Sequence, residues 1–331
     1  MKFENIALGS LLQVFSLWRN SMQLYARIFA IAVAALMSVG TAHAQISVSG
    51  GNVTISTSGS YIVTAGNVYN LTIAASNVTL NLNGYNIGAG NSGGSRGAPC
   101  QIAASGMGNT CTGTLSGTNE ITVTGSNVKI SNGSVIGGPN NGIVINPPLG
   151  TGADITLSDL LVKDFVGYGV QINGDGATLI NVKAVQNGQG GIMANHNVIL
   201  VNVSANYNNH DGITLGSGEV LENVTANFNS GKGIFANGSA TVARSTTSHN
   251  GSTGIFLSGV IRDHIAYGNV GDGVNSAGGF GLVIDSVATQ NSGNGFALNV
   301  HTCYSGLSAN FNTLEQIAGG TPLSGTVASC E

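Results

Sequence analysis

A glycine followed by an apolar residue returns at nearly constant spacing through the second half of the chain. Subtracting residue numbers gives separations of 27, 22, 21, 21, 21, 19 and 22 residues. The pairs are Gly142-Ile143, Gly169-Val170, Gly191-Ile192, Gly212-Ile213, Gly233-Ile234, Gly254-Ile255, Gly273-Val274 and Gly295-Phe296. A period in this range indicates stacked copies of one supersecondary unit.

Each repeat also carries a small residue and an asparagine at fixed distances before the glycine, after an apolar run such as Val198–Val203. This order predicts a strand, an Asn turn, the glycine and a second short strand. A unit without helices cannot bury a core alone, but units stacked at about 4.8 Å cover one another. The predicted interior row is Ile143, Val170, Ile192, Ile213, Ile234, Ile255, Val274 and Phe296.

The asparagines form a column of their own, four residues before each glycine. Its members are Asn187, Asn208, Asn229, Asn250, Asn269 and Asn291. We interpret them as a structural ladder of stacked amides that hydrogen-bond to one another, and not as catalytic residues. We interpret the glycine as the residue that makes the turn.

The rest of the chain is organised around this array. Residues 45–87 alternate apolar and polar residues between Gly and Asn turns, which is typical of short strands. Residues 88–118 break the pattern and are predicted to form an excursion loop. The most regular coils are predicted over 136–300, the solenoid over 45–312, and a cap that protects the open end over 313–331.

Two segments make the pattern specific: Asn77-Val78-Thr79-Leu80-Asn81-Leu82-Asn83-Gly84, and Asn127-Val128-Lys129-Ile130-Ser131-Asn132-Gly133 followed by Asn141-Gly142-Ile143. Together with the repeats they resemble secreted right-handed parallel β-helix repeat proteins of the pectate-lyase-like superhelix, over about residues 46–312. The resemblance implies an all-β, single-stranded right-handed parallel β-helix with coils of about 19–27 residues. The family includes lyases, epimerases, hydrolases and binding proteins, so it implies a fold more than a function.

The N-terminus has the order of an export signal. From Met22 a basic residue, Arg27, precedes the apolar run Ile28–Val39 and small residues that end at Ala44. We expect secretion with cleavage after Ala44, and we interpret Lys2–Ser21 as an upstream extension. No later stretch is long and apolar enough to span a membrane.

Charge excludes one class of partner. The whole chain has 10 basic and 14 acidic residues, and residues 1–44 hold 3 and 1 of them, so the mature chain has 7 basic and 13 acidic residues, a formal charge of −6. Without a basic stripe, binding to nucleic acid by phosphate neutralisation is not expected.

The four cysteines are Cys100, Cys111, Cys303 and Cys330. Export favours disulfides, and pairing of nearest neighbours is one of three connectivities that four cysteines allow. Metal binding by these scattered thiols is the alternative.

Stacking turns the repeat spacing into lateral contact, so outward-facing columns are the candidate sites. The position before the repeat glycine places Asp211 and Lys232 on adjacent coils, with His210 beside them and Asp272 two coils on. A carboxylate near a lysine suits proton abstraction from a uronic acid. A surface ion pair is the structural alternative.

A second column holds Asn181, Asn202 and Asn223 and then changes to Arg244, Asp263 and Asp285. The two acids could bind a cation such as calcium, or act as an acid and base pair on a glycosidic bond. Charge pairing between coils is the structural alternative. No other cofactor is indicated by a sequence motif.

A third column, two residues after the glycine, places Phe235 and Phe256 on adjacent coils. If Ile234 and Ile255 point inward, both rings point outward and could hold a sugar ring, unless a turn covers them.

These columns predict a secreted protein that engages polysaccharide along one face. Three roles remain open: a polysaccharide lyase or glycoside hydrolase, a carbohydrate-binding or adhesion protein without catalysis, and a structural protein of the cell envelope. The oligomeric state is not predicted.

Overall fold

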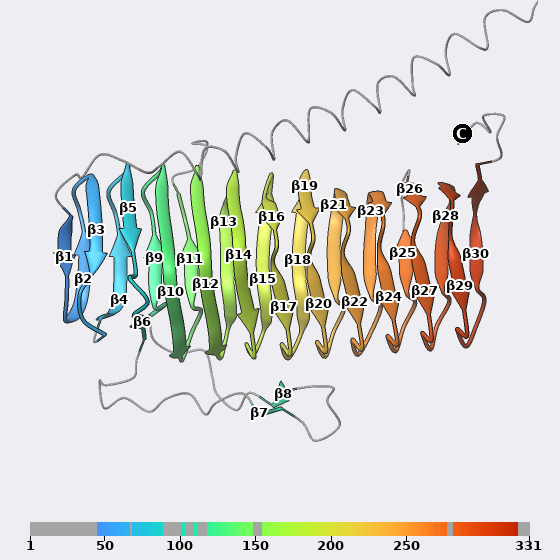
Figure 1. The fold of residues 1–331 in the computed structure, drawn as a ribbon, viewed down its shortest axis with the longest axis horizontal. Helices are drawn as coiled ribbons and strands as arrows, with labels where there is room; N and C mark the ends of the chain where they lie inside the picture. Colours follow the sequence, from blue (N-terminus) through green and yellow to red (C-terminus); the bar gives the residue numbers. More distant parts are fainter. Residues whose placement is uncertain are drawn as a thin grey trace, which may run out of the picture. The chain divides into compact units, whose positions relative to one another are not determined.

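The strands are parallel and each pairs with strands one coil away. The computed structural model describes residues 45–66, 68–88, 118–147, 154–276 and 281–323, and the backbone of an antiparallel pair, β7 (Gln101–Ile102) and β8 (Asn109–Thr110). All other described strands form one 28-stranded parallel sheet. The chain is a right-handed parallel β-helix of about 11 coils, as predicted. Figure 1 shows the coils side by side along the long axis.

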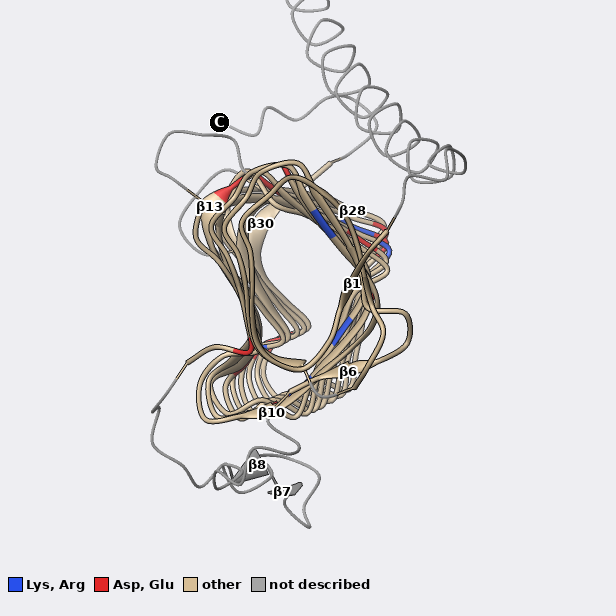
Figure 2. Cartoon of the chain, turned by 90° about the vertical axis from the view of Figure 1, so that its left-hand side faces the viewer, with Lys and Arg blue, Asp and Glu red and all other residues tan. Residues whose placement is uncertain are grey.

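Each coil has three faces around an apolar core, and the coils superimpose when seen end-on (Figure 2). Face I carries the residues of the Gly–apolar repeat. Its own strands are β2 (Gly51–Ile55), β4 (Val68–Ile73), β9 (Ile121–Val123), β11 (Ile143–Ile145), β13 (Tyr168–Asp175), β15 (Gly190–His196), β18 (Asp211–Ser217) and β25 (Val274–Ser276). Four strands run on from face I into face II: β21 (Ile234–Ala243), β23 (Ile255–Arg262), β28 (Phe296–Ser305) and β30 (Ile317–Pro322).

Face II follows face I along each coil, and face III closes the coil. The strands of face II alone are β1 (Ile46–Val48), β3 (Gly59–Val63), β5 (Val78–Asn81), β16 (Ile199–Val201), β19 (Glu219–Glu222) and β26 (Gly281–Ile284). Three strands run on from face II into face III: β10 (Val128–Gly138), β12 (Ile155–Phe165) and β14 (Ala177–Val185). The strands of face III alone are β6 (Asn86–Ile87), β17 (Ser204–Asn206), β20 (Thr225–Asn227), β22 (Thr246–Ser248), β24 (Ile265–Tyr267), β27 (Val287–Thr289) and β29 (Ser308–Asn310).

The predicted interior row is confirmed. Its eight members, from Ile143 to Phe296, pair in register from coil to coil, and each is fully buried. The row extends to Ile121 on one side and to Ile317 on the other. Because successive strand residues point to opposite sides, the register also fixes which residues of face I point outward.

The asparagine column is a buried hydrogen-bonded ladder between faces III and I. In a typical step, Asn229 Oδ1 accepts from the backbone N and from the Nδ2 of Asn208, both at 3.0 Å. Asn229 Nδ2 donates to Ala205 O at 2.9 Å and to Asn250 Oδ1 at 3.1 Å. The ladder runs through Asn291 to Asn312, whose Nδ2 donates to Gln316 Oε1 at 2.9 Å. The interpretation of this column as a structural ladder is confirmed.

The repeat glycine has a different role from the one predicted. The left-handed turn residue stands just before each ladder asparagine, at φ 58° in Tyr207 and 56° in Phe228. Gly212 does not have a positive φ, but a Cβ there would lie 2.6 Å from Asn229 Nδ2 and 2.7 Å from Gly233 O. Glycine is therefore required because the ladder amide and the next coil approach its Cα, not because it makes the turn.

Several predictions concern residues that the structure does not describe. The signal segment 1–44, most of the excursion loop 88–118, and Cys100, Cys111 and Cys330 lie outside the described residues, so cleavage and disulfide pairing stay predictions. Cys303 is buried on β28. After residue 312 the stack continues, because β30 pairs with β28. No helix among the described residues is long and apolar enough to cross a membrane.

Candidate functional site

Three predicted residues meet on the outer side of face I. Phe235 and Phe256 are paired in register on β21 and β23, both half-buried, with ring centroids 5.5 Å apart and planes 51° apart. Lys232 Nζ lies 4.6 Å from the centroid of Phe235 and 5.7 Å from that of Phe256. We call these residues the Lys232 cluster. The rings hold the ammonium group by cation–π attraction, so a fixed positive charge stands beside two aromatic rings.

Asp211 lies one coil away, and its carboxylate contacts the backbone of Lys232. Asp211 Oδ1 accepts from the backbone N of Lys232 at 2.7 Å and lies 3.9 Å from His210 Nδ1. The structure thus brings Asp211 and Lys232 to adjacent coils, but the Lys232 ammonium turns to the aromatic rings. His210 is 73% exposed at its side chain. The acid caps a backbone N–H group, as Asp commonly does in turns.

Asp272 repeats this role three coils after Asp211. Its Oδ1 accepts from the backbone N and from the Nδ2 of Asn294, at 2.8 and 3.0 Å, and its Oδ2 accepts from Asn275 Nδ2 at 2.8 Å. A side chain on the following coil would collide with these carboxylates, and glycines stand there: Gly231 opposite Asp211 and Gly293 opposite Asp272. Both acids are thus built into turns of face I.

Tyr168 joins Asp211 across an intervening coil, and the sequence analysis did not select it. Its ring passes over Gly190, where a Cβ would lie 3.0 Å from Cε1 of the tyrosine. Burial raises the pKa of the Tyr168 hydroxyl, and the Asp211 carboxylate raises it further. The hydroxyl therefore stays protonated at neutral pH and can donate a proton or a hydrogen bond. The sequence offered one sign of this arrangement: the position before the repeat glycine is a tyrosine in one coil and a glycine in the next, which leaves room for the ring.

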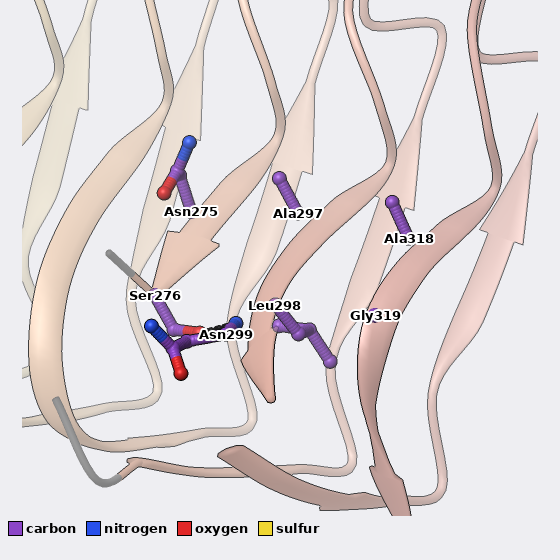
Figure 3. Close-up of a pocket in the computed structure, with 7 residues that line it drawn as sticks. All are labelled: Asn275, Ser276, Ala297, Leu298, Asn299, Ala318 and Gly319. Atoms are coloured by element: carbon purple, nitrogen blue, oxygen red, sulfur yellow. Dashed lines mark hydrogen bonds between the residues drawn. The ribbon is translucent and has the colours of Figure 1, made fainter. Parts of the chain in front are cut away.

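Face I is hollowed next to the Lys232 cluster, towards the C-terminal coils (Figure 3). The outward positions after Phe256 are Asn275, Ala297 and Ala318, which pair in register. These short side chains leave an open depression of about 440 Å³. Its lining is Asn275, Ser276, Ala297, Leu298, Asn299, Ala318 and Gly319. The outer side of face I therefore offers aromatic rings, a fixed cation and a shallow hollow in line along the axis.

The charged column predicted around Arg244 lies at the corner between faces II and III. Its six positions from Asn181 to Asp285 are exposed and all have left-handed backbones, with φ between 46° and 55°. Asn and Asp adopt this conformation more readily than other side chains do. The corner thus explains the asparagines and aspartates as turn residues. Arg244 has no such preference and needs a separate reason.

Arg244 pairs with Glu222, a residue that the sequence analysis missed. Arg244 Nη2 contacts Glu222 Oε1, and their side chains are 48% and 7% exposed. Burial raises the pKa of Glu222, while Arg244 and Arg262 act in the opposite direction. The arginine compensates a carboxylate that lies almost without solvent. Glu222 gives no repeated signal in the sequence, because the same register position holds Val201, Ala243, Arg262 and Ile284 on other coils.

Two further buried groups were missed. Burial raises the pKa of Glu219 on β19 to about 6, and burial lowers the pKa of His264 to about 3. His264 Nε2 lies 3.0 Å from Thr247 Oγ1 inside the solenoid. Neither residue faces the outer side of face I, and both concern the stability of the fold.

No group of three or more His, Cys, Asp or Glu side chains that could hold a metal ion occurs within the described ranges. Asp263 and Asp285 stand on adjacent coils as predicted. The cation that we predicted for them stays a prediction.

Comparison with known proteins gives structures of similar fold only. The sequence matches no family model and no curated protein. The Dettilon tailspike protein is 13% identical with a TM-score of 0.48; the match covers 80% of this chain and 60% of the tailspike, less than two thirds of its length. Pectate lyase Pel9A is 17% identical with a TM-score of 0.48, covering 79% and 74% of the two chains.

The A-module of a mannuronan C-5 epimerase from Azotobacter vinelandii is 16% identical with a TM-score of 0.43, covering 85% of this chain and 91% of the module. At such identities these likenesses concern the fold alone.

Proposed function

We propose that the outer side of face I binds an extended, negatively charged polysaccharide outside the cytoplasm, after removal of residues 1–44. The observation that carries the proposal is the Lys232 cluster, in which a cation is held against two outward aromatic rings. A uronate carboxylate would pair with the ammonium group, and the apolar side of a sugar ring would pack against Phe235 or Phe256.

The geometry of a β-helix supports a polymer as the ligand. Equivalent side chains recur at each coil, about 4.8 Å apart, a step close to the length of one pyranose unit in an extended glycan. A chain lying along the axis would meet the Lys232 cluster and then the hollow at Asn275, Ala297 and Ala318. Glycan binding without cleavage fits the acids best, since Asp211 and Asp272 already accept backbone hydrogen bonds.

Affinity measurements with the full secreted chain test the proposal. The probes are sodium polygalacturonate and sodium alginate as acidic glycans and dextran as a neutral one. Each aromatic contact is worth about 1 kcal/mol, so Phe235→Ala with Phe256→Ala should weaken binding by about tenfold or more. Lys232→Met should weaken binding to the acidic probes more than to dextran.

Phe311→Ala is the matched control, because Phe311 is 83% exposed and lies outside face I. Equal binding by the wild type, the double variant and Phe311→Ala would refute the proposal.

A second candidate is cleavage of the same class of polymer. It is favoured by the group of Tyr168, His210 and Asp211, a protonated hydroxyl near a carboxylate and an exposed imidazole on one face. Such a group can take and return a proton beside a sugar carboxylate. The new reducing ends released from the acidic probes measure it. The candidate requires Tyr168→Phe to lower the rate at least about tenfold; no release by the wild type excludes it for these probes.

A further inference from the structure

Along the start of face I, acidic residues outnumber basic ones. The position before the repeat glycine holds, on successive coils, Asp211, Lys232, Thr253, Asp272, Asn294 and Glu315. Counted from Lys232, one acid stands one coil before it, one stands two coils after it and one stands four coils after it. The other lysines and arginines that the structure describes lie on faces II and III or at the corner between them. One fixed cation therefore stands among three carboxylates in this column.

Each of these carboxylates repels an anionic sugar that is placed beside it. Neighbouring coils are about 4.8 Å apart, which is less than the distance of about 8 Å over which physiological salt screens a charge. The Asp211 side chain is only 13% exposed, so its charge is screened even less. A uronate beside Lys232 gains an ion pair, whereas a uronate beside Asp211 or Asp272 meets a like charge.

The spacing of the acids determines which acidic glycans fit. With one sugar to a coil, a run of four sugars that covers the coil of Lys232 also covers the coil of Asp211 or that of Asp272, however it is shifted along the axis. A run of four uronates therefore always sets one carboxylate against another. A single uronate among neutral sugars avoids this repulsion, because it alone lies beside Lys232.

The groups around Lys232 also suit neutral sugars. An ionised carboxylate has about four acceptor sites. Asp211 and Asp272 use only part of theirs in the turns of face I, so they can still accept hydrogen bonds from sugar hydroxyls. The hollow beyond Phe256 is lined by amides, one hydroxyl and apolar side chains, with no charged residue (Figure 3). The sugars beside the uronate would thus meet acceptors and a neutral surface.

We propose that the ligand of face I is a heteropolysaccharide in which single uronates are separated by neutral sugars, and not a homopolymer of uronates. The inference rests on the proposed function and specifies the substrate class of the same site. The single ammonium group between Asp211 and Asp272 selects for sparse charge, because each further uronate adds repulsion and finds no second cation.

Calorimetric titration of the full secreted chain with two fragments of equal length tests the inference. One is a gellan tetrasaccharide, which has one glucuronate among neutral sugars, and the other is tetragalacturonate. The wild type should bind the gellan fragment at least about tenfold more tightly, because tetragalacturonate sets like charges against each other. Lys232→Met should weaken the binding of both fragments.

Substitution of the acids identifies the cause of the preference. Asp211→Asn with Asp272→Asn removes two charges but keeps at each position an oxygen that accepts from the backbone N–H. The ratio of the two affinities should therefore fall by about tenfold. Asp159→Asn is the matched control and should leave the ratio unchanged, because Asp159 stands at the corner between faces II and III, where the next coil already has Asn181. Unchanged melting temperatures establish that the variants fold.

The outcomes separate the inference from the proposed function. Equal affinities of the wild type for the two fragments, or a ratio that the double asparagine variant does not change, overturn the inference alone. Binding of the gellan fragment that Phe235→Ala with Phe256→Ala does not weaken overturns the proposed function. A wild type that binds neither fragment overturns both.

Discussion

Two columns of polar residues run along the solenoid, one inside the turn between faces III and I and one on the corner between faces II and III. The inner column is asparagine at every coil from Asn187 to Asn312, and each member is buried. The outer column also begins with asparagines linked amide to amide, as in the 2.7 Å bond from Asn223 Nδ2 to Asn202 Oδ1. It then changes to Arg244, Asp263 and Asp285.

The difference lies in what replaces a lost hydrogen bond. When a buried amide is removed, its former partners remain buried with neither a hydrogen-bond partner nor water. The cost is the full desolvation of each of these groups. At the exposed corner, solvent satisfies the same groups, and the requirement that remains is a side chain able to adopt a left-handed backbone. Charge can therefore enter the outer column but not the inner one. The following predictions test this contrast.

Acid should act on the inner side of the solenoid through His264, with the largest expected effect. Its neighbour Thr247 accepts from ladder residue Asn269 at its carbonyl, 3.1 Å away. Burial lowers the pKa of His264 from 6.5 to about 3. Between these pH values the histidine is protonated in the unfolded chain and neutral in the folded chain. Stability should fall as pH falls from about 6.5 to about 3, by up to about 4 to 5 kcal/mol.

Urea unfolding at neutral pH and at mildly acidic pH measures this effect. His264→Gln should remove most of the difference that the wild type shows. His210→Gln, at an exposed histidine, should not. If the wild type, His264→Gln and His210→Gln all lost the same unfolding free energy between the two pH values, the effect could not be assigned to His264.

Asn229→Ala should cost about 3 to 4 kcal/mol of unfolding free energy. It removes the acceptor of Asn208 and the donor to Ala205 O and to Asn250 Oδ1. Urea unfolding at neutral pH gives the value. Asn229→Gly should be at least as harmful, since the loss is of partners and not of backbone fit. A cost below that of the outer-column variants would break the comparison.

Arg244→Ala should cost about 2 kcal/mol at neutral pH, because it removes the paired counter-charge of a nearly buried carboxylate and leaves only Arg262 to act on it. The partial exposure of the arginine limits the loss. Without Arg244 the pKa of Glu222 should rise further, so the cost should shrink as pH falls and the acid takes a proton. Urea unfolding at two pH values checks both points. Lys129→Ala, at an exposed lysine on face II, serves as control and should change little.

The smallest effect is expected at Asn223. Asn223→Ala should cost about 1 kcal/mol, because alanine resists the left-handed backbone of φ 54°, whereas Asn223→Gly should cost about half of that or less. Melting temperatures of the two variants give the order. If glycine were worse than alanine, the amide contact and not the backbone would dominate this corner.

The fold was predictable because stacking converts a sequence period into contact. The apolar partner of each glycine, such as Ile213, had to face the core if the coils were to cover one another, and Asn229 had to face Asn208. The column of Phe235 and Phe256 was predictable for the same reason. The outward side of each column follows from strand alternation alone.

What the sequence did not yield depends on side-chain direction or on contact between columns. The Lys232 side chain points to the aromatic rings and not to Asp211. The register of the strands fixes which residues are neighbours but not which neighbour a long side chain contacts. Glu222 and Arg244 belong to different columns. Besides the pair of Tyr168 and Gly190, a second signal was present in the sequence: Tyr207, Phe228 and His249 precede successive ladder asparagines, and their rings stack with centroids 5.0 and 4.8 Å apart.

The inner ladder has a direction, and that direction bears on how such a chain changes length. Each ladder asparagine gives its backbone N–H and one Nδ2 hydrogen to the Oδ1 of the asparagine on the following coil. A coil duplicated anywhere between Asn187 and Asn312 therefore supplies the acceptor that the preceding coil needs and finds its own acceptor on the following coil. Only the last rung lacks a successor. Gln316 ends the series there, because it accepts from Asn312 Nδ2 and returns its own Nε2 hydrogen to Asn312 O at 3.2 Å. A coil can therefore be duplicated within the array without leaving a ladder amide unpaired, whereas the end of the ladder depends on Gln316.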